Sequence, residues 1–195
     1  GTTEQLRPLY ALDGSTLGPE AVITELCGYA GSRPVRVGNA ADHQVQLDVF
    51  GPVALLIDLL DRAGAPLTPA HLTLLEQLSH AVLRRWHEPD HGIWEERVAA
   101  RHHTHSKVMC WVTLERTAAL FVRRGLAGHE ALDAVARHIR DDVLEHAWNP
   151  RVGAFTATYD GEALDAAALW VGLSGMVPGD DERFAATVRA VEAHR

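Results

Sequence analysis

Apolar residues recur at helical spacing through most of the chain after residue 45. Val49, Val53, Ile57 and Leu60 form one such stripe, and the segment after Lys107 is apolar on nearly every side. Spacings of three and four residues place side chains on one face of an α-helix, and a helix that is apolar all round is buried. The pattern predicts six helices, over roughly residues 49–60, 69–86, 107–124, 132–148, 164–173 and 181–191.

Proline, glycine and hydroxyl residues mark the expected helix ends. Gly64 and Pro66 end the first helix, and Thr68-Pro69 begins the second. Ser106 is expected to cap the third helix. The connections over residues 86–106 and 148–163 are long, whereas those over residues 64–68 and 125–129 are short. This alternation predicts antiparallel helical hairpins in a ring or layer, with the long loops gathered at one end.

Residues 1–45 lack this periodicity and are punctuated by glycine and proline. A loop-rich stretch of that length in a compact protein tends to be functional. We therefore expect one helical domain over residues 1–195, with a loop-rich N-terminal arm over 1–45 and helical hairpins over 46–195. The fold class expected from the pattern is all-α.

Charge, apolar runs and cysteine content exclude some classes of partner and indicate a cellular compartment. The formal charge of -8 argues against a nucleic-acid partner, because phosphate binding needs a basic face. No apolar run reaches the ~18 residues needed to span a bilayer and no signal segment is recognisable, so no membrane partner and a cytoplasmic location are expected. Cys27 and Cys110 each follow apolar neighbours and are expected to be buried free thiols.

The candidate chemistry is concentrated between Trp86 and Trp111, where Glu95 and Glu96 directly follow Trp94. An indole surface and a like-charged neighbour both destabilise a carboxylate, so one glutamate of the pair is expected to stay protonated and to act as an acid. Adjacent loop residues need not point the same way, so the pair is not expected to be acid and base together. Solvated surface carboxylates are the alternative that the residues leave open.

Three histidines, His102, His103 and His105, follow the glutamate pair. Their H-H-x-H spacing lacks a further cysteine or carboxylate at zinc-ligand distance along the chain, so no metal and no cofactor are expected. His105 and Lys107 are candidates for lining a substrate site, and capping or surface roles are the alternative.

Four stretches of the chain carry the likeness to a known family. They are G-Y-A-G-S-R-P-V-R-V-G-N-A-A from Gly28, Q-V-Q-L-D-V-F-G from Gln44, P-D-H-G-I-W-E-E-R with H-T-H-S-K-V-M-C-W from Pro89, and F-T-A-T-Y-D-G-E-A-L-D-A-A from Phe155. In this order they resemble glycoside hydrolase family 15, which includes glucoamylases and bacterial trehalases. The resemblance implies an (α/α)-barrel, a sugar bound at its loop end, and hydrolysis of α-glucosidic bonds with inversion.

The resemblance also assigns roles to individual residues. The family's general acid is the glutamate after the tryptophan of G-I-W-E, which is Glu95 here, and Glu96 matches a position that binds the sugar on the leaving-group side. Asp48 falls in a sugar-contacting segment, and His105 and Lys107 match an H-S-K segment near the site. Three further residues are expected to bind substrate: Trp94 beside the acid, Arg36 in the arm, and Asp165, for which capping is the alternative.

The resemblance covers only the central part of the family's catalytic domain. The family's β-rich domain, its glucose-gripping Arg-Asp motif and its general base have no counterpart in residues 1–195. The expected architecture is therefore a partial (α/α)6-barrel of the six-hairpin glycosidase type, about half of the toroid. Pro52, His103 and Ala167 also depart from residues that are common in the family.

The leading hypothesis is a glycosidase-like enzyme that acts on α-glucosides or a trehalose-like substrate, with Glu95 as general acid. A half-barrel exposes apolar flanks, so a homodimer or a complementing chain is expected to supply the base. Two alternatives stay open. One is a repurposed acid/base catalyst, such as a cyclase, isomerase or dehydratase of a small metabolite. The other is a catalytically silent sugar- or metabolite-binding protein.

Overall fold

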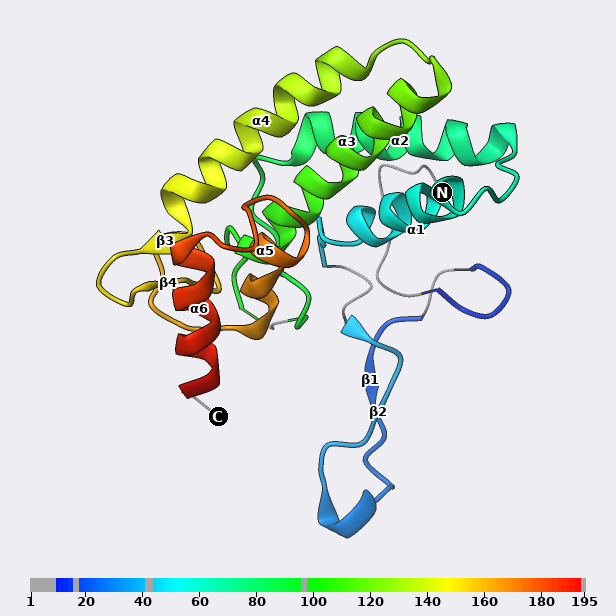
Figure 1. The fold of residues 1–195 in the computed structure, drawn as a ribbon. Coiled ribbons are helices and arrows are strands. Elements are labelled where there is room, and N and C mark those ends of the chain that lie inside the picture. Colours follow the sequence, from blue (N-terminus) through cyan, green and yellow to red (C-terminus); the bar gives the residue numbers. More distant parts are fainter. Residues whose placement is uncertain (1–9, 16–17, 41–43, 96–97, 194–195) are drawn as a thin grey trace.

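The computed structural model describes residues 10–15, 18–40, 44–95 and 98–193. Six α-helices lie within these residues (Figure 1). Their bounds are α1 Phe50–Arg62, α2 Pro69–Arg85, α3 Thr104–Arg124, α4 His129–His146, α5 Trp170–Leu173 and α6 Glu182–Ala193. The described part of the chain is therefore mostly helical, as the apolar spacing predicted. None of its helices is both long enough and apolar enough to cross a membrane.

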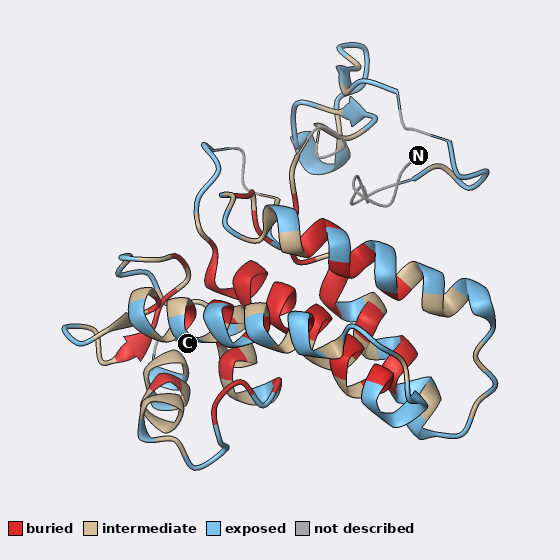
Figure 2. Ribbon diagram, turned by 90° about the horizontal axis from the view of Figure 1, so that it is seen from above, coloured by how far each residue is buried: buried red, intermediate tan, exposed pale blue. Residues whose placement is uncertain are grey.

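Helix α3 is the centre of the packing. It contacts α1, α2, α4 and α5, and most of its residues are buried, as its all-round apolar sequence predicted. Figure 2 shows buried positions on α3 and on the sides of α1, α2 and α4 that face it. The short turns α1–α2 and α3–α4 lie at one end of this helical layer, and the two long loops leave from the other end (Figure 1).

Local chemistry accounts for the start of α2 and of α6. Thr68 caps α2 as expected and shares a capping box with His71. Asp181 accepts hydrogen bonds from two backbone N–H groups at the start of α6. The expectation that Ser106 caps α3 is wrong, because the helix begins at Thr104 and the Ser106 hydroxyl donates to Asp90 instead. A buried carboxylate from a distant segment therefore takes the hydroxyl that the sequence assigned to a cap.

Short strands complete the fold. In the arm, β1 (Ala21–Val22) pairs with β2 (Arg36–Val37) as an antiparallel hairpin that projects away from the helices (Figure 1). A second pair, β3 (Trp148–Asn149) and β4 (Ala154–Phe155), follows α4. A 3-10 helix, Ala166–Leu169, leads into α5. Cys110 is buried and free as expected, but Cys27 is exposed in the arm, so that expectation is wrong.

Helices α1 and α3 approach closely where α1 has a glycine. A β-carbon built on Gly51 would lie 2.6 Å from the Met109 Sδ and 2.8 Å from its Cβ. Both distances are shorter than van der Waals contact, so a side chain at residue 51 would force the helices apart.

We predict that Gly51→Ala lowers the free energy of unfolding by about 1–3 kcal/mol, the usual cost of overpacking a core. Urea denaturation followed by circular dichroism measures this change. Gly179→Ala, where a β-carbon would meet nothing within 4 Å, is the matched control and should not lower it. A stability unchanged by Gly51→Ala contradicts the close approach.

Candidate active site

The acidic segment between α2 and α3 is a closed loop. Asp90 and Arg101 pair through two backbone hydrogen bonds, each 2.8 Å, and so bring the two ends of residues 90–101 together. We call residues 90–101 the acid loop. Trp94 and Glu95 lie on it, whereas Glu96 and its predicted role fall outside the described residues.

The backbone of the acid loop holds Glu95 in an unusual conformation. Glu95 has φ 53°, in the left-handed region that few non-glycine residues occupy. Gln44 Nε2 donates to the Glu95 carbonyl at 3.3 Å, and the Glu95 N–H points at the Gly92 carbonyl, 3.4 Å away. Gly92 is also left-handed, and a β-carbon there would meet the His103 ring at 2.7 Å. Such strain persists only where surrounding contacts enforce it, and it concentrates at functional sites.

Asp90 anchors the acid loop to the helices. Its side chain is fully buried, and its Oδ2 accepts from the Leu47 N–H at 3.0 Å and from the Ser106 hydroxyl at 2.7 Å. One carboxylate thus ties together the segment before α1, the acid loop and the first turn of α3. Asp90 was not among the site residues predicted from the sequence. Its position after Pro89 indicates an aspartate that stabilises a turn, but it does not indicate which donors the carboxylate accepts from.

Asp48 is buried and lies within electrostatic range of Glu95. Burial raises the pKa of Asp48 to about 6, and the negative charges of Asp90 and Glu95 add to the increase. Its Oδ1 has no hydrogen-bond partner among the described residues. A buried carboxyl oxygen without a partner is costly, and such groups in native proteins commonly serve binding or catalysis.

His105 lies within electrostatic range of Asp165 and of Asp90, the first residue of the acid loop. Burial lowers the pKa of His105 to about 4, which the nearby negative charges of Asp165 and Asp90 only partly oppose, so the imidazole is neutral at pH 7. Asp165 accepts a hydrogen bond of 2.6 Å from the Trp94 indole and also caps the 3-10 helix through the Ala167 N–H. Capping and contact with Trp94 therefore coexist at Asp165.

The structure brings five of the predicted site residues into one neighbourhood: Asp48, Trp94, Glu95, His105 and Asp165. We call this group the acid-loop site. Its members come from the segment before α1, the acid loop, the first turn of α3 and the start of the 3-10 helix. Glu95 is half-buried and Trp94 is 63% exposed, so the site is open to solvent on the side of the indole.

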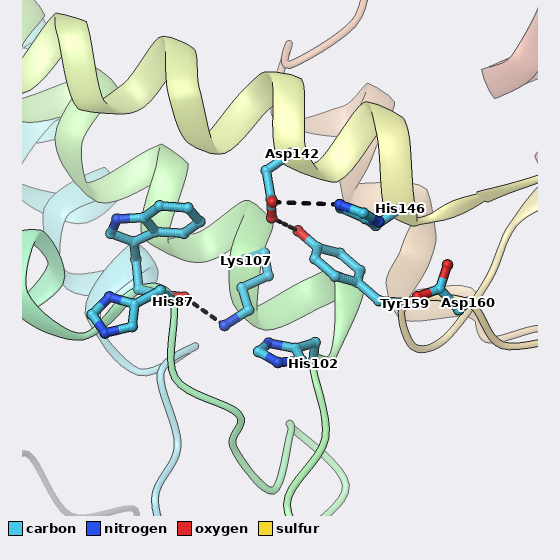
Figure 3. A pocket seen from close by; sticks show the side chains of 8 residues that line it. His87, His102, Lys107, Asp142, His146, Tyr159 and Asp160 are labelled. Atoms are coloured by element: carbon cyan, nitrogen blue, oxygen red, sulfur yellow. Dashed lines mark hydrogen bonds and ion pairs between the residues drawn. The ribbon is translucent and has the colours of Figure 1, made fainter.

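Two predicted site residues lie elsewhere. Lys107 is buried and donates through its Nζ to the Trp86 and Glu88 carbonyls, at the end of α2. Its side chain lines a different cavity (Figure 3). Arg36 is in the projecting hairpin, where it forms an ion pair with Glu20 at 3.1 Å. The structure does not bring either residue to the acid-loop site.

The three histidines point in different directions. His102 stacks on Tyr159, with ring centroids 5.7 Å apart, whereas His105 packs edge-on against Trp170. His103 lies against Gly92. Within the described ranges, no group of three histidine, cysteine or carboxylate side chains is arranged to hold a metal ion.

Similar proteins place the chain in a family. A trehalase of Mycobacterium tuberculosis is 38% identical over 187 residues, which are 95% of this chain and 27% of that protein. Trehalase 1 of Sulfolobus acidocaldarius is 34% identical, and a trehalase of Thermoplasma acidophilum is 30% identical; each match covers 96% of this chain and 32% of the relative. The chain thus spans about a third or less of the length of these curated relatives.

Solved structures agree on the fold. A wild-type glycosidase matches with a TM-score of 0.69 and 22% identity, and a glycosidase variant in complex with glucose matches with a TM-score of 0.68 and 23% identity. Both matches cover 84% of this chain and 45% of the other chain. The predicted resemblance is confirmed: the model of glycosyl hydrolases family 15 matches residues 2–194, and the chain belongs to that family.

Proposed function

We propose that this chain carries the general-acid side of an active site that hydrolyses α-glucosides, with a trehalose-like disaccharide as substrate. The observation that carries the proposal is the position of Glu95. It is half-buried on a strained, closed loop, next to an indole and close to the buried Asp48. The trehalase relatives support the substrate class, because their sequences match almost the whole of this chain.

In the proposed reaction, the protonated Glu95 carboxyl donates its proton to the glycosidic oxygen as the bond to the anomeric carbon breaks. In an inverting enzyme, a second carboxylate some ~6.5–9.5 Å away activates a water on the opposite face of the sugar. Asp48 and His105 offer unpaired buried polar atoms to the sugar hydroxyls. The Trp94 indole, oriented by Asp165, covers one sugar face, and Glu96 binds the leaving glucose.

The activating carboxylate comes, in this proposal, from a segment outside residues 1–195. The relatives are three or more times longer than the matched region, and the solved glycosidases about twice as long. The six helices would then form about half of an (α/α)6 toroid, which the rest of a longer polypeptide or a partner chain completes. A solvent-exposed apolar strip on α1, formed by Leu56, Leu59 and Leu60, suits such packing.

Replacing Glu95 tests its role as the acid. We expect Glu95→Gln to lower kcat/KM for trehalose about 10²–10⁴-fold, the usual contribution of general acid catalysis. Hydrolysis of α-glucosyl fluoride should fall far less, because fluoride leaves without a proton. Glucose release by the complete polypeptide that carries residues 1–195 is the measurement.

Glu88→Gln is the matched control, since Glu88 precedes the acid loop and pairs with Arg85. It should leave both rates nearly unchanged. Equal losses on both substrates would make Glu95 a structural residue rather than the acid. If the wild-type polypeptide binds trehalose but releases no glucose between pH 4 and 8, the hydrolase proposal fails and a silent sugar-binding protein is favoured.

The raised pKa of Asp48 predicts a pH-dependent stability. Between its ordinary value of 3.8 and about 6, the folded state keeps a proton that the unfolded state releases. The stability contributed by the protonated carboxyl is therefore complete below pH 3.8 and lost as pH rises through 6. Asp48→Asn keeps a neutral side chain at every pH. The variant should gain up to about 3 kcal/mol relative to wild type between pH 3.8 and 7.5.

Urea unfolding at several pH values checks this prediction, and Asp61→Asn is a control of opposite sign. Burial raises the pKa of Asp61, but hydrogen bonds from Arg124 and Arg123 outweigh it and hold the pKa below the ordinary value. Asp61→Asn should therefore lose stability relative to wild type as pH rises. A pH-independent difference between Asp48→Asn and wild type would contradict the burial of an ionisable carboxyl at residue 48.

A further inference from the structure

A polar cavity lies beside Lys107 of α3. It has a volume of about 270 Å³ and is lined by Trp86, His102, Lys107, Asp142, His146 and Tyr159, among others (Figure 3). We call it the rear cavity. None of the five residues of the acid-loop site lines it. It is therefore a separate place for a ligand, independent of the proposed hydrolase function.

The wall of the rear cavity is already ordered. The Tyr159 hydroxyl donates to Asp142 Oδ2 at 2.8 Å. The Tyr159 ring lies between two imidazoles, with centroids 5.7 Å from His102 and 5.5 Å from His146. Figure 3 shows these side chains coming from α4, from the segment after β4 and, for His102, from the residue that directly follows the acid loop. A pre-formed polar wall costs little conformational entropy when it binds a ligand.

Hydrogen-bonding capacity is left over on two groups that line the rear cavity. An ammonium has three donors, and Lys107 Nζ uses two of them on the Trp86 and Glu88 carbonyls. Asp142 Oδ1 lies 3.8 Å from His146 Nε2, beyond hydrogen-bond distance. The charges of the two side chains influence each other. A ligand with several hydroxyls can pair with both groups, because a hydroxyl can accept from an ammonium and donate to a carboxylate.

The charges of the lining argue against an anion. Two carboxylates, Asp142 and Asp160, oppose the single ammonium of Lys107. Burial and the charge of Lys107 lower the pKa of His102, so this imidazole adds no positive charge at pH 7. A cation in direct contact with the Lys107 ammonium would be repelled by it. A ligand that contacts both Lys107 and Asp142 is therefore best matched when it is neutral.

The cavity has the size of one sugar ring. Its volume corresponds to on the order of nine water molecules, at about 30 Å³ each. Trp86 adds an apolar indole to the polar wall, and sugars pair C–H faces with such surfaces. We propose that the rear cavity binds a neutral polyhydroxylated ring, a monosaccharide or a cyclitol, through Lys107 and Asp142.

An occupied rear cavity would act on the acid loop through Lys107. The same ammonium holds the Trp86 and Glu88 carbonyls, which lie four and two residues before Asp90. A hydroxyl bound to Lys107 therefore touches the group that fixes the entry of the acid loop. The rear cavity is in this way a non-catalytic site placed to stiffen the loop that carries Glu95.

Nuclear magnetic resonance of the ¹⁵N-labelled chain tests the proposal, with the indole N–H signals of Trp86 and Trp94 as reporters. Glucose and myo-inositol should shift the Trp86 signal with a Kd on the order of millimolar, and inorganic phosphate should not. Asp142→Asn should weaken this binding about ten-fold or more, because it removes a charged acceptor. Asp141→Asn, the exposed neighbour on the same helix, is the matched control and should leave the Kd unchanged.

Circular dichroism first shows that each variant is folded, and Asp160→Asn replaces Asp142→Asn should the latter unfold. A Trp86 signal that no neutral polyol moves overturns the proposal. Sugar binding from which inorganic phosphate displaces the sugar also overturns the proposal. The same is true of binding that neither Asp142→Asn nor Asp160→Asn weakens. A sugar that shifts Trp94 alone, and is lost in Glu95→Gln, occupies the acid-loop site. That result supports the proposed function and overturns the proposal that the rear cavity binds a sugar.

Discussion

The buried carboxylate of Asp90 is the constraint on which the candidate site depends. Its Oδ2 receives the Leu47 N–H and the Ser106 hydroxyl, while its backbone closes the acid loop on Arg101. Burying a carboxylate is costly, and the two hydrogen bonds from Leu47 and Ser106 offset part of that cost. The result is that Glu95 is carried on a loop whose base cannot move independently of α1 and α3.

Burial then sets the protonation of the groups around the acid loop, in opposite directions for acids and bases. It raises the pKa of Asp48 to about 6 and lowers that of His105 to about 4. Both shifts favour the neutral form, because a low-dielectric surrounding disfavours any isolated charge. These shifts cost stability: the Asp48 cost is complete above pH 6 and the His105 cost below pH 4, and natural proteins commonly accept such costs at sites that bind or react.

Helix α3 separates two polar regions, although the residues that face them, His105 and Lys107, are close in sequence. Residues His105 and Lys107 are two positions apart, so they project from the helix about 200° apart, at about 100° per residue. His105 therefore belongs to the acid-loop site, and Lys107 belongs to the rear cavity. His105 and Lys107 of the H-S-K segment were both expected to line the substrate site, but the helix directs their side chains to different places.

Local pattern by itself determined the helices, the family and much of the candidate site. The apolar stripes, the Thr68 cap and the G-I-W-E step depend only on neighbours along the chain, so periodicity and motif were sufficient to predict them. The closeness of Asp48 to Glu95 was expected from the family likeness, and the two lie within electrostatic range.

Tertiary structure alone decided the contacts between distant segments. Asp90 reaches Ser106 across 16 residues and Leu47 across 43, and no local signal names those partners. The same holds for the left-handed backbone of Glu95, the exposure of Cys27 and the burial of Lys107. Lys107 and the Glu95 carbonyl find their partners only once distant segments have packed, and Cys27 is exposed because the arm projects away from the helices (Figure 1). Each is a property of the assembled fold.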